Sequence, residues 1–157
     1  MNPDLDLTLQ RLIRAPRVSV WQAWTDPTAL ERWFLPAPVR CRVDRLEPRR
    51  GGALVTSMSQ DDSSFSSHLD ACFLVVDEPK RIVFTTAVDR EWRPAGASLL
   101  MTAEVTLLDH PDGTDYRVLV RHGDPSARAR HEQLGFEDGW GTVTEQLARL
   151  VEREVPA

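Results

Sequence analysis

The 157-residue chain has little of several features that would place it in a specialised class. It has two cysteines, one lysine and one tyrosine, and no apolar run approaches the roughly 20 residues that a membrane span needs. The first six residues, Met-Asn-Pro-Asp-Leu-Asp, contain neither the basic nor the apolar segment of a signal peptide. We therefore predict a cytoplasmic protein with no membrane partner.

The chain also lacks motifs for metal or covalent chemistry. Cys41 and Cys72 do not form a Cys-x-x-Cys motif and no histidine-rich tract is present, so we expect reduced thiols and no zinc. No nucleophile elbow, phosphate-binding loop or paired carboxylate in an apolar setting occurs. The pair Gly51-Gly52 is followed by neither lysine nor a helix start, which is typical of a turn. We predict no catalytic residue, no metal and no cofactor.

The charge balance excludes one class of partner. The chain carries 19 basic and 24 acidic residues, for a net charge of −5, whereas nucleic-acid-binding domains concentrate basic residues on one face. Acidic Asp44 and Glu47 interrupt the densest basic stretch, residues 40–50, as on a solvated strand that runs into a turn. We predict no nucleic-acid partner.

Length and composition favour one domain over residues 1–157, with a core from about 5 to 153. Hydrophobic residues make up 41% and charged residues 27%, as in ordinary globular proteins. A chain of this size buries roughly 70% of its unfolded surface. It therefore needs no disulfide or metal to hold a core.

Alternation of apolar and polar residues predicts seven strands. In the sixth, for example, Met101, Ala103 and Val105 share one face and Thr102 and Glu104 the other. Short connections between consecutive strands favour antiparallel pairing. The expected strands cover residues 5–14, 40–46, 53–58, 65–76, 81–87, 98–108 and 114–122.

Helix starts are marked by proline, twice with a preceding aspartate that can cap the free amides. Pro16 and Asp26-Pro27 predict two short helices, and Asp124-Pro125 predicts a long helix over residues 125–153. A break near Gly135 is the competing interpretation. Five residues of the long helix fall on one inward face: Phe136, Trp140, Val143, Leu147 and Leu150.

These elements predict an α+β helix-grip fold. A curved antiparallel sheet of six to seven strands would be crossed on its concave face by the long C-terminal helix, with the two short helices closing one end. One helix cannot fill the concave face of so wide a sheet. We therefore expect a cavity between the long helix and the sheet.

Motifs over almost the whole chain resemble one family. They are Ile13-Arg14-Ala15-Pro16, Val20-Trp21-x-Ala23-Trp24-Thr25-Asp26-Pro27, Leu30-x-x-Trp33-Phe34-x-Pro36, Gly51-Gly52, Glu78-Pro79-x-Arg81-Ile82-Val83-Phe84-Thr85, Asp112-Gly113-Thr114 and Gly135-Phe136-x-x-Gly139-Trp140. The chain is similar to the C-terminal domain of the heat-shock-protein-90 ATPase activator, in the START/Bet v-like (SRPBCC, polyketide-cyclase-like) superfamily. It departs in lacking the glycine that members often carry near Asp70.

The resemblance implies the helix-grip fold and three candidate functions. The first is non-catalytic binding of an apolar or aromatic small molecule in the cavity. The second is a polyketide cyclase or dehydratase with Tyr116 or His122 as acid and base. The third is co-chaperone action on heat-shock protein 90, ranked last because we expect no room for the further N-terminal domain of the eukaryotic activator. A homodimer is left open.

The candidate ligand-binding residues are mostly apolar, as in most small-molecule sites. Tyr116 and His122 continue the inward phase of the last strand, whereas His131 lies about 140° from Phe136 if the helix is straight. His68 is interpreted as an ordinary strand residue, and Trp92 as a loop residue that can contact a ligand. The candidate residues are Trp33, Phe34, Phe84, Met101, Tyr116, Val118, His122, Phe136 and Trp140.

Overall fold

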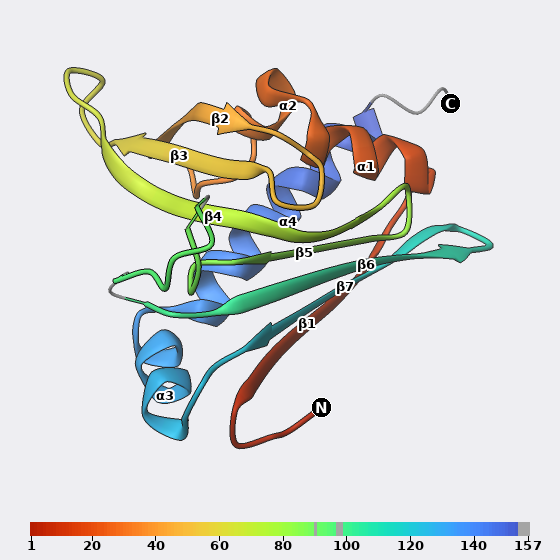
Figure 1. Ribbon diagram of the computed structural model, residues 1–157. Coiled ribbons are helices and arrows are strands. Elements are labelled where there is room, and N and C mark those ends of the chain that lie inside the picture. The colour runs from red at the N-terminus through yellow and green to blue at the C-terminus, as the bar shows by residue number, and fades with distance from the viewer. Residues whose placement is uncertain (90, 97–98, 154–157) are drawn as a thin grey trace.

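One seven-stranded antiparallel sheet forms the body of the protein, in a computed structural model that describes residues 1–89, 91–96 and 99–153 (Figure 1). The strand order is β1-β7-β6-β5-β4-β3-β2, so each strand from β2 to β7 pairs with its neighbour in sequence and β1 joins β7 at the far edge. The predicted α+β helix-grip fold is confirmed. The strands are β1 (Asp6–Ile13), β2 (Arg40–Leu46), β3 (Ala53–Ser59), β4 (Ser66–Asp77), β5 (Arg81–Thr85), β6 (Thr102–His110) and β7 (Gly113–Arg121).

The helices begin where the aspartate-proline pairs predict. α1 covers Arg17–Thr25, and α2 covers Pro27–Glu31 after the cap at Asp26, whose carboxylate accepts from the Thr28 amide at 3.3 Å. α3 covers Pro125–Gln133 after Asp124, whose carboxylate accepts from the Ala127 amide at 2.8 Å. Proline at the first helical position loses no hydrogen bond there, since that amide has no partner in any helix.

The predicted single helix over 125–153 is wrong, and the competing break near Gly135 is confirmed. α3 ends at Gln133, and α4 begins again as Phe136–Arg153. Gly135 between them has φ +93°, a left-handed conformation that glycine adopts at little cost. Because the break resets the helical phase, the angle computed for His131 on a straight helix does not apply, and its side chain is buried.

Two strands differ from their predicted bounds at the loop between β5 and β6. β5 ends at Thr85 rather than at residue 87, and β6 begins at Thr102 rather than at 98 and continues to His110. Next to the end of β5, the Thr86 side chain accepts from the Met101 amide and donates to the Leu99 carbonyl. These side-chain hydrogen bonds add to the backbone bond from the Thr86 amide to the Met101 carbonyl, 3.0 Å.

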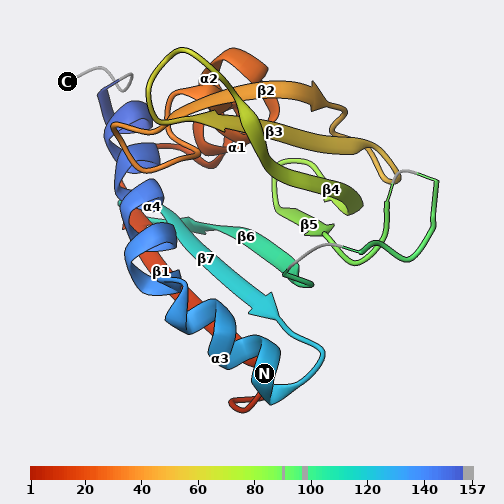
Figure 2. The same cartoon turned by 90° about the vertical axis from the view of Figure 1, so that its left-hand side faces the viewer.

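α4 crosses the opening of the curved sheet, from the β1 side to α1 (Figure 2). Its Gln146 amide nitrogen donates to the carbonyls of Trp33 and Leu35 at 2.9 and 2.8 Å, which fixes α4 to the segment after α2. Leu147 is fully buried and Trp140 partly so. The inward stripe predicted from the sequence therefore faces the sheet.

Both edge strands of the sheet lie against helices. β1 contacts α3 and α4, and β2 contacts α2. On β1, Arg11 forms ion pairs with Glu145 and Glu152 of α4. On β2, the Val43 amide donates to the Glu31 carboxylate at 2.8 Å, just before a register shift in the pairing with β3.

None of the helices in the described ranges is long and apolar enough to cross a membrane.

Candidate functional site

Four of the predicted site residues meet around one tryptophan of α1. The Trp24 ring lies 4.9 Å from that of Trp33, 5.6 Å from that of Phe34 and 6.0 Å from that of Phe84, centroid to centroid. Its indole nitrogen donates to the Tyr116 hydroxyl at 3.2 Å. Edge-to-face rings at these distances add stability beyond area burial. We call Trp24, Trp33, Phe34, Phe84 and Tyr116 the tryptophan cluster.

Tyr116 is built into this cluster as a core residue. Its side chain is fully buried, and burial raises the pKa of its hydroxyl well above the ordinary value. A general acid or base needs a pKa near the working pH. Tyr116 and His122 are also six residues apart along β7, which is about 20 Å in a strand. The two groups proposed for acid and base chemistry therefore do not share a site.

A solvent-exposed histidine lies beside the tryptophan cluster, at a bulge in β4. The pairing of β3 with β4 shifts register between Thr56 and Ser57, which leaves His68 without a ladder partner. The His68 ring turns toward Phe34, 5.9 Å between centroids, and its Nδ1 lies 2.8 Å from the buried Thr56 hydroxyl oxygen. His68 is exposed, yet desolvation lowers its pKa. His68 is therefore a solvent-exposed ring in contact with the edge of the tryptophan cluster.

The other predicted residues on the inner side of the sheet differ in exposure. Val118 is buried in the middle of β7, whereas Met101 and Trp140 are only partly buried and pack against the core. Trp140 extends from α4, and Met101 precedes β6. The partly exposed part of the predicted site therefore includes Trp140 from α4 and Met101 from the segment just before β6.

A second group of rings forms at the other end of β7. The Nε2 atom of His122 lies 2.9 Å from Nδ1 of His131, and the His131 ring is 5.2 Å from that of Phe136, which is 6.1 Å from that of Trp140. Both histidines are buried, at 6% and 7% exposure. Burial, and then the neighbouring His122, lower the pKa of His131 to about 4. We call His122, His131, Phe136 and Trp140 the histidine cluster.

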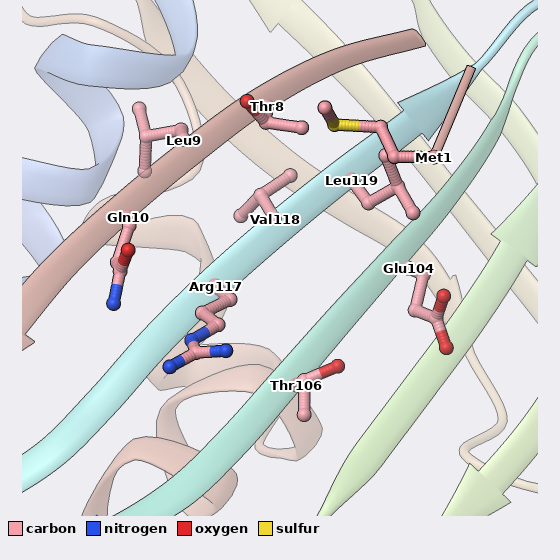
Figure 3. A pocket seen from close by; sticks show the side chains of 9 residues that line it. All are labelled: Met1, Thr8, Leu9, Gln10, Glu104, Thr106, Arg117, Val118 and Leu119. Carbon is pink, nitrogen blue, oxygen red and sulfur yellow. The ribbon is translucent and has the colours of Figure 1, made fainter.

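The two measured hollows lie away from both clusters' centres. One, of about 450 Å³, lies on the outer face of β1, β7 and β6, where Gln10, Arg117 and Thr106 lie side by side and Glu104 lies further along β6 (Figure 3). Its charges are already paired, since Glu104 bridges Arg81 and Arg121 and Arg117 pairs with Asp115. This hollow is a polar sheet face and not the predicted apolar cavity.

The second hollow, of about 230 Å³, lies where the N-terminal residues meet α3 and α4. Phe136 is the predicted site residue on its wall. The remaining walls come from Met1, Pro3, Asp6, Leu7, Thr8, Arg128, Glu132 and Glu137.

The described part of the chain contains no cluster of side chains that could hold a metal ion. No group of three or more histidine, cysteine, aspartate or glutamate side chains converges there. Both cysteines are buried free thiols. Burial, and after it the negative charges of Glu31 and Asp44, raises the pKa of the Cys41 thiol to about 12. Cys41 is therefore protonated at neutral pH and a poor nucleophile.

Sequence reasoning missed four side chains, three that lie at these clusters and one on α4. His131 was placed off the inward face because the helix was drawn straight, although Gly135 carried the signal for the break. His68 and Thr56 meet only through a bulge, and no residue type in β4 marks that bulge. Thr144 on α4 is 2% exposed, and its hydroxyl has no hydrogen-bond partner among the described residues.

Comparison with known proteins gives one family and many structures of the same fold. The family described as activator of Hsp90 ATPase homolog 1-like protein matches residues 14–152. A crystal structure of a protein from Nitrosomonas europaea is 35% identical, with 99% of each chain covered and a TM-score of 0.88. A search of the curated proteins gives no match.

More distant structures share the fold alone. A crystal structure from Mycobacterium smegmatis is 23% identical over 94% of this chain and 91% of that chain, with a TM-score of 0.78. A solution structure of an AHSA1-like protein from Aeromonas hydrophila is 21% identical over 96% and 94%, with a TM-score of 0.70.

Proposed function

The chain belongs to the family of activator of Hsp90 ATPase homolog 1-like proteins, and from this premise we propose that it binds an apolar or aromatic small molecule on the concave face of its sheet. The binding surface lies between α4 and the sheet and includes Trp140 and Met101. The tryptophan cluster forms its rigid end. Binding sites of this kind are mostly apolar, with a few polar groups that orient the ligand.

The contact of the exposed His68 ring with the tryptophan cluster is the observation that carries the proposal. An exposed imidazole with a lowered pKa, in contact with the Phe34 ring and with the Thr56 hydroxyl, offers an apolar wall and one polar group at the same place. Its ring is neutral at pH 7, since its pKa is lowered from a value of 6.5. A neutral imidazole can donate or accept one hydrogen bond to a ligand without a charge.

The remaining predicted residues support the proposal in different ways. Trp140 and Met101 are the candidates for direct contact, because both stay partly exposed while packing on the core. Trp33, Phe34, Phe84 and Val118 are buried and give the surface its shape. A ligand contact at Tyr116, His122 or Phe136 stays a prediction.

Binding of 1-anilinonaphthalene-8-sulfonate at pH 7.5 tests the proposal. We expect a dissociation constant in the micromolar range, competition by fatty or aromatic compounds, and a change in tryptophan emission. Trp140→Ala should weaken binding at least about fivefold, since a buried aromatic contact contributes on the order of 1 kcal/mol or more.

Leu108→Ala is the control, because Leu108 is an exposed apolar residue of β6 that shares the outer face of the sheet with Glu104 and Thr106. This variant should bind the dye as the unmodified protein does. Absence of saturable binding, or equal losses in the two variants, would contradict a ligand site on the concave face.

A further inference from the structure

The helix α3 is docked through one buried side chain. Among its nine residues only His131 is buried. Surface helices usually dock through a stripe of apolar side chains, and α3 has no such stripe. Its attachment therefore depends on what the His131 ring contacts.

That ring is held by a hydrogen bond whose direction can be assigned. His122 Nδ1 lies 2.8 Å from the Leu5 carbonyl oxygen, which can only accept, so this nitrogen donates. His122 Nε2 is then an acceptor in the neutral ring, and His131 Nδ1 donates to it at 2.9 Å. The docked pair is neutral, and it joins α3 to the end of β7 and to the segment before β1.

A glycine with open space around it lies near each end of α3. Gly123 precedes its capping residue and Gly135 follows it, and a Cβ atom added to either glycine would meet nothing within 4 Å. Leu134, beside the second glycine, is 66% exposed. A second tie between α3 and the sheet is the bond from Arg128 Nε to the Asp6 carbonyl oxygen, 3.1 Å.

We propose that α3 is a gate at this end of the concave face, latched by burial of the neutral His131 ring against His122 and Phe136 and released when that ring takes up a proton. This proposal rests on the proposed function, because the surface that the gate covers includes Phe136 and adjoins Trp140. Release removes His131 from both His122 and Phe136. His122, just after β7, and Phe136, at the start of α4, then face water.

The sign of the effect follows from the two states of His131. In the docked state a proton places a charge on a ring that is buried against Phe136 and beside His122, which lowers the pKa of His131 to about 4. In the released state the ring is in water, where its ordinary value is about 6.5. The released state binds the proton more tightly, so it gains roughly tenfold in population for each pH unit between about 6.5 and 4.

Charged groups surround the pair without bonding to it. In the described residues no carboxylate is hydrogen-bonded to either histidine ring. Arg128 and Glu132 pair with each other at 3.0 Å, and Arg121 on β7 pairs with Glu104 across the sheet. The charged groups that line the hollow at Phe136 are, by element, Asp6 on β1, Arg128 and Glu132 on α3, and Glu137 on α4.

Hydrogen exchange measured by mass spectrometry on the full chain between pH 7.5 and 4.5 tests the gate. After correction for the intrinsic exchange rate, the protection of residues 125–134 should fall about tenfold per pH unit below pH 6.5. Residues 142–150 of α4 should keep their protection over the same range. Equal protection of 125–134 at pH 7.5 and 5 would overturn the proposal.

His131→Asn separates the latch from other acid effects, since asparagine keeps a donor nitrogen and does not titrate. We expect its α3 to stay protected at pH 5. If this variant does not fold, as judged by circular dichroism, His131→Phe replaces it with the same expectation. His110→Asn is the control, because His110 is an exposed residue at the end of β6, and it should behave as the unmodified protein does. Acid release that persists without His131 would assign the effect to the carboxylates and overturn the latch.

The outcome is independent of the binding test at pH 7.5. Dye binding with pH-independent exchange of α3 rejects the gate and keeps the function, and acid release without dye binding does the reverse. When both hold, the dye should associate several-fold faster at pH 5.5 than at pH 7.5 in the unmodified protein, and at equal rates in His131→Asn.

Discussion

The two ends of the concave face are built with different chemistry. At the tryptophan cluster, indole N–H groups donate to fixed oxygens, Trp24 to Tyr116 and Trp33 to the Ala23 carbonyl at 2.9 Å. At the histidine cluster, the donor and the acceptor are both imidazoles, a type of side chain that can take up a proton. An indole keeps its proton at every physiological pH, whereas the contact between two imidazoles depends on how many protons the pair carries. The tryptophan cluster is therefore insensitive to pH, whereas the histidine cluster responds to it.

The largest effect should come from Trp24→Ala, which we expect to cost about 3–5 kcal/mol of unfolding free energy, the usual range for a buried tryptophan. Trp24 is fully buried and contacts three rings. Urea denaturation at pH 7.5 measures the loss. Trp24→Phe keeps a ring without the N–H and should lose clearly less. A loss below about 1 kcal/mol for alanine would remove the contrast between a fixed and an adjustable end.

Acid should produce the next largest effect, and it should act through the histidine cluster. The folded-state pKa of His131 is lowered to about 4 from 6.5, so the stability is full above about pH 6.5 and falls as the pH drops toward 4. The loss is at most about 3 kcal/mol, at 1.36 kcal/mol per pKa unit. Urea denaturation at pH 7.5, 5.5 and 4.5 measures it, with His131→Asn for comparison. A flat profile down to pH 4.5 would show that His131 charges without cost.

Trp140→Ala should cost less than the loss of Trp24, about 1–2 kcal/mol, since this side chain is only partly buried and truncation then leaves a smaller unfilled volume. The measurement is the shift in the urea midpoint at constant slope. A loss of 3 kcal/mol or more would mean that Trp140 is a packed core residue instead of the wall of an open surface.

The smallest effect, and the one with the opposite sign, should come from Thr144→Val. The Thr144 hydroxyl is buried without a partner, and valine has nearly the same shape without the polar group. We expect a gain of about 1 kcal/mol, because a buried hydroxyl that lacks a hydrogen bond is destabilising by roughly that amount or more. Thr142→Val, at an exposed position of the same helix, is the control and should change stability little. A destabilised Thr144→Val would show that the hydroxyl has a partner in solution.

The sequence predicted the fold well because its signals are local. Aspartate followed by proline marks the starts of α2 and α3, and the alternation in β6 and β7 assigns the inward faces through Val105 and Val118, which are buried. The same reasoning failed at Gly135. Helix propensity says that glycine destabilises a helix, but it does not say whether the helix continues through the glycine or ends there.

The candidate site was less predictable because its contacts are long-range. His122 and His131 meet across nine residues only because α3 turns back at the break. His68 reaches Phe34 through a register shift that depends on the whole pairing of β3 with β4. Neither contact follows a sequence period or a residue spacing from which it could be predicted.

The helices at both edges of the sheet also bear on how this chain behaves at high concentration. An uncovered edge strand is a template on which another chain can add a strand, as in domain swapping and fibril growth. Here β1 lies against α3 and α4, and β2 lies against α2, whose Glu31 occupies the Val43 amide. A second copy has to displace a helix before it can extend the sheet. If α3 is the helix that acid releases, the N-terminal part of β1 is the place where self-association would begin.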